Sequence, residues 1–131
     1  MALGMSISAT LYTAEPLSAE VLVALRAHGS GLLSITVVPM PKQHFITDDY
    51  GLEPNVFVQF ILDKEHSSQS RAELSLAIRE FLAASERDAL LKYIDVPVIR
   101  RVEGARQVAP GYEEFAPEQV GWLVSSIEPR A

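Results

Sequence analysis

The residues best suited to chemistry lie in a proline-framed loop that we expect at positions 40–54. His44, Asp48, Asp49 and Tyr50 place an imidazole, two carboxylates and a phenol close together in the chain. Such groups can transfer protons or ligate a metal ion. Their spacing matches no established ligand or catalytic motif, so the simpler interpretation is a polar loop whose two aspartates set up a turn.

The same loop also has the composition of a binding surface, because aromatic residues alternate there with charged ones. A second segment, Tyr112-Glu113-Glu114-Phe115, repeats this composition. The residues that we expect to contact a partner are Phe45, Asp48, Asp49, Tyr50, Tyr112, Glu113 and Glu114. The opposite interpretation stays open for Phe45, Ile46 and Phe115, which could instead pack into the core and leave only their polar neighbours exposed.

The charge of the chain limits the classes of partner. Its formal net charge is -6, whereas nucleic-acid binding needs a basic surface. Basic residues do gather late in the chain, at Arg87, Lys92, Arg100, Arg101 and Arg106. Acidic residues are interleaved with them, which predicts cross-strand charge pairs on a solvent-facing sheet. We therefore expect a protein partner, such as a basic toxin, and no nucleic acid.

The chain contains no cysteine, which excludes disulfides, thiolate catalysis and zinc–thiolate sites. The three histidines, His28, His44 and His66, are too widely spaced to form a ligand motif. We therefore expect no metal, no cofactor and no catalytic residue. The lack of cysteine suits a reducing cytoplasm, and no apolar stretch is long enough to span a membrane.

Length and composition predict one globular domain over residues 1–131, with residues 1–4 as a dispensable leader. Of the 131 residues, 48% are hydrophobic and 21% charged, which disfavours disorder. Two helices are expected, Ser18–His28 and Ser70–Ala84, each with one apolar stripe. Strands are expected at 5–12, 32–38, 55–63, 88–93, 97–102 and 106–108. Segment 117–127 is compatible with either a helix or a strand.

This order predicts an α+β fold, with a single antiparallel-rich sheet and both helices on one face. It corresponds to a ferredoxin-like βαββαββ variant, in which right-handed crossovers remove most alternatives. Many functions occur on this architecture, so the fold alone does not select one.

The chain also resembles a known family in the pattern of four segments. These are ISATLY at 7–12, PLS at 16–18, RDALL at 87–91 and PVIRRVEG at 97–104. Together they resemble the Sit-type immunity proteins, small cytoplasmic partners of toxins exchanged between bacterial cells. The turn between the last two segments, Ile94-Asp95-Val96, lacks the glycine expected there. The resemblance implies neutralisation of a toxin by occlusion, with no catalytic residue.

Two functions remain as hypotheses from the sequence. The first is a non-enzymatic protein-binding domain of the immunity type, of unknown oligomeric state. The second is a small-molecule-binding or enzymatic α+β domain with a pocket near the 40–54 loop.

Overall fold

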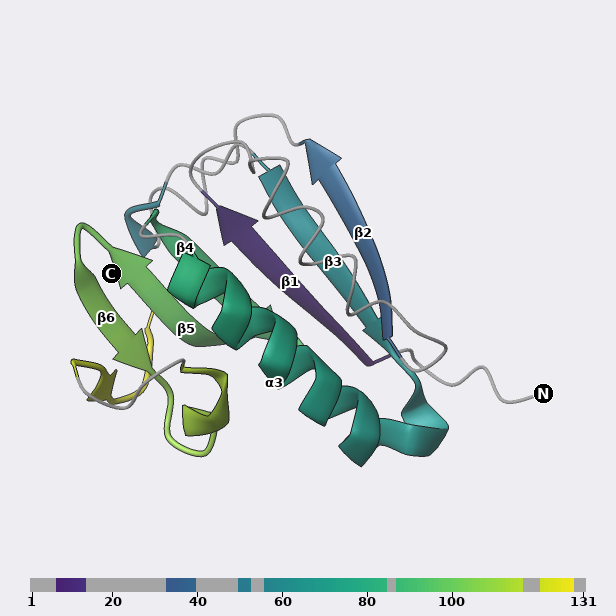
Figure 1. Cartoon of the computed structure of the whole chain (residues 1–131). Coiled ribbons are helices and arrows are strands. Elements are labelled where there is room, and N and C mark those ends of the chain that lie inside the picture. Colours follow the sequence, from purple (N-terminus) through teal and green to yellow (C-terminus); the bar gives the residue numbers. More distant parts are fainter. Residues whose placement is uncertain are drawn as a thin grey trace.

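The computed structural model describes residues 7–13, 33–39, 50–52, 56–84, 87–116 and 121–128. Seven strands form one mixed sheet. In chain order they are β1 (Ile7–Thr13), β2 (Leu33–Pro39), β3 (Val56–Leu62), β4 (Ala89–Tyr93), β5 (Val96–Val102), β6 (Ala105–Val108) and β7 (Leu123–Val124). Their spatial order is β2-β3-β1-β4-β5-β6-β7, so β2 and β7 lie at opposite edges (Figure 1).

The middle of the sheet is built from strands whose residues alternate between the two faces. In β1, Ala9 and Leu11 are buried, and in β3, Val58 and Phe60 are buried opposite them. Every second residue thus points towards the same layer, as the period of a strand requires. β3 lies between β1 and β2, in the interior of the sheet.

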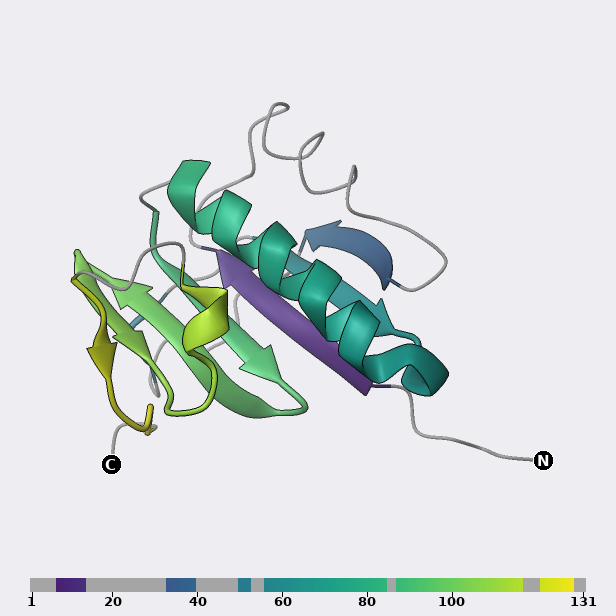
Figure 2. The same ribbon diagram turned by 60° about the horizontal axis from the view of Figure 1, so that its bottom comes forward.

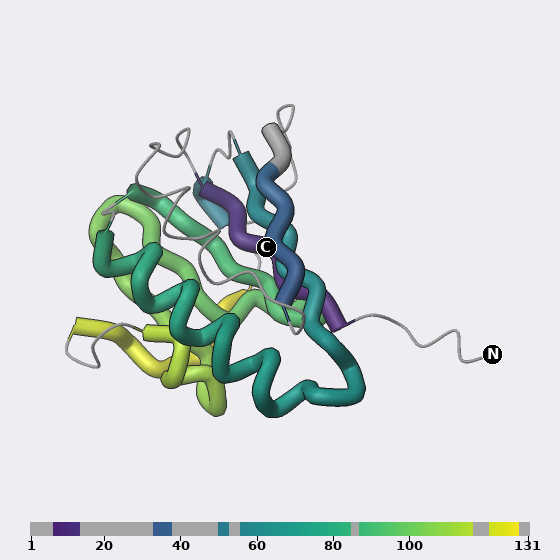
Figure 3. The backbone as a smooth tube through the Cα atoms, turned by 45° about the vertical axis from the view of Figure 1, so that its right-hand side comes forward, coloured from purple at the N-terminus to yellow at the C-terminus, as the bar shows by residue number. Residues whose placement is uncertain are grey.

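One long helix covers one face of the sheet. It is α3 (Ser67–Ala84), preceded by the 3-10 turn η1 (Lys64–His66), and it lies over the sheet roughly along the direction of β1 (Figures 2 and 3). The helix begins at Ser67, three residues before the predicted start at Ser70. The hydroxyl of Ser70 accepts a hydrogen bond from the N–H of Asp63 at 3.2 Å. Asp63 caps η1 by accepting the N–H of Glu65 at 2.8 Å.

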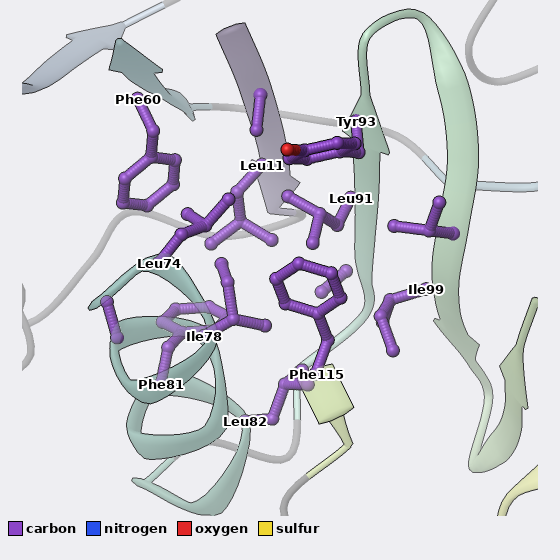
Figure 4. Packing of buried hydrophobic residues seen from close by; sticks show 14 of the residues in the cluster. Leu11, Phe60, Leu74, Ile78, Phe81, Leu82, Leu91, Tyr93, Ile99 and Phe115 are labelled. Atoms are coloured by element: carbon purple, nitrogen blue, oxygen red, sulfur yellow. The ribbon is translucent and has the colours of Figure 1, made fainter. Parts of the chain in front are cut away.

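The core between α3 and the sheet is largely apolar. Leu74, Ile78 and Phe81 of α3 are buried against side chains of the central strands, as their helical spacing predicts. The ring of Phe115 lies in the middle of this layer, between α3 and Ile99 (Figure 4). Phe115 is thus a core residue and not an exposed contact for a partner.

A second, smaller cluster lies against the opposite face of the sheet. It contains the buried residues Tyr50, Leu52, Leu90, Val102 and Ile127. Leu90 belongs to this cluster, whereas its neighbour Leu91 belongs to the core under α3. β4 is therefore buried on both faces.

The C-terminal segment forms an edge strand. β7 pairs in parallel with β6, through Gln107 with Leu123 and Val108 with Val124. The helical alternative for 117–127 is wrong for its described part, 121–127. Gly121 adopts a φ of 87°, which suits a turn and not a helix. Trp122 is buried and belongs to the core cluster.

One late arginine departs from the expectation of a solvated charge. Arg101 is buried and donates to the carbonyl oxygens of Leu82 at 2.8 Å and Arg87 at 2.9 Å. Leu82 lies in the last turn of α3, where carbonyls lack helical partners and a cation is favourable. Arg101 thus joins the sheet to the end of the helix.

The α+β class with an antiparallel-rich sheet is confirmed. The predicted helix Ser18–His28 and positions 40–49 of the predicted loop lie outside the described residues. Among the residues that are described, no helix combines the length and apolarity needed to cross a membrane.

Candidate functional site

The acidic–aromatic segment at 112–115 forms a short, tightly bonded turn beside β6. It contains the 3-10 turn η2 (Glu113–Phe115). The N–H of Phe115 donates to Tyr112 at 3.0 Å, and that of Ala116 donates to Glu113 at 3.1 Å. The carboxylate of Glu113 accepts the N–H of Gly111 at 2.6 Å. The backbone and Glu113 therefore define one conformation for the segment.

Arg71 of α3 anchors this turn to the helix. Its guanidinium carbon lies 4.9 Å from the centre of the Tyr112 ring, 5.4 Å from that of Tyr93 and 5.6 Å from that of Phe115. These distances allow cation–π attraction to all three rings. The rings also contact one another, with centres 5.9 to 6.2 Å apart.

Two hydrogen bonds complete the environment of Arg71. Its Nη2 donates to Glu114 Oε1 at 2.6 Å and to the carbonyl oxygen of Gly111 at 3.1 Å. Charge-assisted bonds of this kind are stronger than neutral ones. Although 31% of its side-chain surface stays exposed, Arg71 thus links α3 to η2.

The directions in which the pKa values of Arg71 and Tyr93 are shifted agree with this geometry. Burial by itself lowers the pKa of Arg71, but the hydrogen bond and negative charge of Glu114 outweigh it and the pKa is raised. Burial raises the pKa of Tyr93, and the nearby Arg71 charge offsets part of that rise. Arg71 is thus a cation and Tyr93 a neutral phenol at neutral pH, which are the states that attract each other.

A hollow of about 320 Å³ lies between η2 and the C-terminal edge strand. Its lining includes Val108, Glu113, Ala116 and Val124. Three of these side chains are apolar, and Glu113 adds a carboxylate already fixed by Gly111. Leu123, the other residue of β7, is among the most exposed large apolar residues of the described chain. We call Glu113, Glu114, Leu123 and Val124, with this hollow, the η2–β7 surface.

The structure separates the two groups of predicted partner-binding residues. Tyr112, Glu113 and Glu114 lie beside α3 and β6, whereas Tyr50 is buried in the cluster on the opposite face. Tyr50 accepts a hydrogen bond from Arg100 Nε at its carbonyl oxygen, at 2.9 Å, and Lys92 Nζ lies 5.5 Å from its ring centre. The other predicted residues, Phe45, Asp48 and Asp49, lie outside the described residues.

Sequence reasoning missed Arg71, Leu123 and Val124. Arg71 precedes its partner Glu114 by 43 positions, and no local pattern signals a contact over that separation. Leu123 and Val124 lie in a two-residue strand, which is too short for a periodic pattern to reveal.

The described histidine shows no metal-site geometry. His66 Nδ1 lies 3.3 Å from Asp63 Oδ2 at the exposed start of α3. Across the described ranges, no three histidine, cysteine, aspartate or glutamate residues gather as a metal site would require. Comparisons of the whole chain with protein-family models, curated proteins and solved structures found no match.

Proposed function

We propose that this chain is a non-enzymatic protein-binding domain whose partner contacts the η2–β7 surface. The observation that carries this proposal is the exposure of Leu123 (64%) and Val124 (49%) beside a hollow that contains a carboxylate. Exposed neighbouring apolar residues rimmed by charge are the usual composition of a protein interface. In the isolated chain their exposure to water has no stabilising role.

The charges around this surface favour a basic partner. Glu113 lines the hollow, whereas the charge of its neighbour Glu114 is paired with Arg71. The net charge of -6 gives the whole molecule the same sign. Such a field raises the association rate with a basic protein more than it lowers the dissociation rate. Apolar contacts with Leu123 and Val124 would supply most of the affinity.

The more specific proposal is an immunity protein that neutralises a toxin by occlusion in the cytoplasm. It is supported by the resemblance to the Sit-type immunity proteins, the lack of cysteine and the acidic balance of the chain. Occlusion needs a rigid surface and no catalytic group. The anchoring of η2 by Arg71 and Gly111 supplies such rigidity at the proposed interface.

The strand pairing supports the ferredoxin-like order that we also propose for the first half of the chain. β1 pairs antiparallel with both β3 and β4, and β2 pairs antiparallel with β3. β1 and β2 therefore run in the same direction with β3 between them. A connection between two such strands requires a crossover, which the predicted helix Ser18–His28 would provide on the face that α3 occupies.

Matched variants test the proposed interface. Leu123→Ser with Val124→Ser removes its apolar part, and Glu113→Gln removes its charge while keeping an acceptor for Gly111. Leu76→Ser is the control, since Leu76 is half-exposed on α3, outside the η2–β7 surface. The probe is the purified product of the gene next to the one that encodes this chain, and the readout is its dissociation constant.

We expect the double serine variant to weaken binding by roughly a hundredfold, as hot-spot losses do. Glu113→Gln should lower the association rate and its dependence on salt. Leu76→Ser should change neither. Absence of binding to this protein, together with a small molecule that raises the melting temperature, would instead favour the ligand-binding hypothesis.

A further inference from the structure

The turn between β4 and β5 combines two features that are unfavourable in an isolated chain. Ile94 and Asp95 both adopt positive φ angles, 51° and 63°. Two-residue hairpin turns require this conformation, and asparagine or glycine normally supply it. Isoleucine is among the residues least suited to it, because its branched side chain crowds the backbone there. Ile94 is also 55% exposed, and Val96 is 48% exposed.

The next hairpin of the same sheet shows the ordinary solution. Its turn, Glu103-Gly104, has φ angles of 52° and 83°. It uses an exposed polar residue first and glycine second. The two turns thus share one backbone geometry but differ in side chains. The geometry therefore does not account for an apolar tip at Ile94.

The base of the β4–β5 hairpin holds this tip rigidly. The N–H of Ile94 donates to the carbonyl oxygen of Ser8 at 3.0 Å. Tyr93, the residue before it, packs on the Tyr112 ring and under Arg71. A bulge between Leu91 and Lys92 shifts the pairing within the same hairpin. Bulges bend and re-aim the strand that carries them.

We propose that the tip residues Ile94 and Val96 form a second docking contact, which inserts into an apolar pocket of a basic protein partner. Strained backbone is retained where another interaction requires it, and a rigid apolar tip loses little entropy on binding. Asp95 at the tip adds a negative charge, which suits a basic rim around the pocket and disfavours an anionic membrane. This inference takes from the proposed function only the class of partner, a basic protein.

The test compares Ile94→Asn with Glu103→Asn, the same substitution at the equivalent position of the second turn. Both should raise the melting temperature by a few degrees, because asparagine tolerates a positive φ. A benzophenone amino acid at position 96, and as a control at position 76, is then cross-linked in cells that naturally produce the chain. The protein joined at position 96 is identified, produced recombinantly and titrated against each variant.

We expect an adduct at position 96 that is absent at position 76. We also expect Ile94→Asn to weaken binding by roughly tenfold or more, while Glu103→Asn leaves it unchanged. A melting temperature of Ile94→Asn at or below that of the wild type would contradict the claim that Ile94 strains the turn. The proposal is overturned by unchanged affinity in Ile94→Asn, by the absence of a specific adduct, or by an adduct joining two copies of this chain. Sedimentation of the wild type, but not of Ile94→Asn, with phosphatidylcholine–phosphatidylglycerol vesicles would assign the tip to membranes instead.

The same titration separates this inference from the proposed function. Loss of affinity in the Leu123→Ser/Val124→Ser variant, with Ile94→Asn unchanged, overturns the tip alone. Loss in Ile94→Asn, with the double serine variant unchanged, overturns the η2–β7 surface alone.

Discussion

Replacing Arg71 by methionine tests whether its guanidinium anchors η2 to α3. Methionine keeps a long apolar side chain on the rings but removes the charge and the donors. Because one guanidinium serves all three rings, we count a single cation–π contribution of about 0.5–1 kcal/mol. The partly exposed bonds to Glu114 and Gly111 add roughly 0.5–1 kcal/mol.

The expected loss of unfolding free energy is therefore about 1–2 kcal/mol, or roughly 4–8 °C in melting temperature for a domain of this size. Amide hydrogen exchange should locate the effect. The N–H groups of Phe115 and Ala116 are bonded within the turn and should exchange faster once it loosens. Urea denaturation and exchange measured by NMR provide both readouts.

Arg79→Met is the matched control on the same helix. Arg79 donates from its Nε to the carbonyl oxygen of Ser75, one turn earlier in α3, at 3.3 Å. Its replacement should cost less than about 0.5 kcal/mol and leave η2 unaffected. Equal stability and equal exchange in the two variants would refute the role assigned to Arg71.

Two further predictions test other parts of the fold. Arg101→Met should reduce the unfolding free energy by about 2–3 kcal/mol, since two buried carbonyls lose a charged donor, whereas the exposed Arg106→Met should change it by less than about 0.5 kcal/mol; denaturant titration measures both. The pKa of Asp63 is lowered, mainly by the N–H of Glu65 that it accepts and also by His66. The stabilisation from this carboxylate is therefore fully present above its ordinary pKa of 3.8 and is lost as the pH falls through its lower folded value. Asp63→Asn should remove that acid dependence, and parallel losses for both proteins on acidification below 3.8 would contradict the assignment.

Local periodicity was sufficient to predict the longer regular elements of the described chain. Alternation identified β1 and β3, and the apolar stripe through Leu74, Ile78 and Phe81 identified α3. Both signals are local, because each element must bury one face wherever it packs.

Contacts between distant segments could not be predicted in this way. Arg101 has the sequence context of a solvated strand residue, but the end of α3 lies over it and supplies buried carbonyls. Tyr50 has the context of an exposed loop aromatic, but it packs under Leu90 and Ile127. In both cases the deciding neighbour comes from a part of the chain that no local pattern connects to it.

The position of β7 explains why the candidate surface was only half predicted. Glu113 and Glu114 stood out because acids flank aromatic residues there. Leu123 and Val124 belong to a strand of two residues, too short for a period to be recognised. Their exposure follows from the edge position of β7, which only the folded sheet defines.

The dissociation constant of the Leu123→Ser/Val124→Ser variant for the adjacent-gene product tests the central claim most directly. It is measured beside the wild type and Leu76→Ser, with far-UV circular dichroism to show that all three are folded. We predict that only the double variant loses affinity, by roughly a hundredfold. Equal dissociation constants for the three folded proteins would contradict the assignment of the η2–β7 surface as the interface.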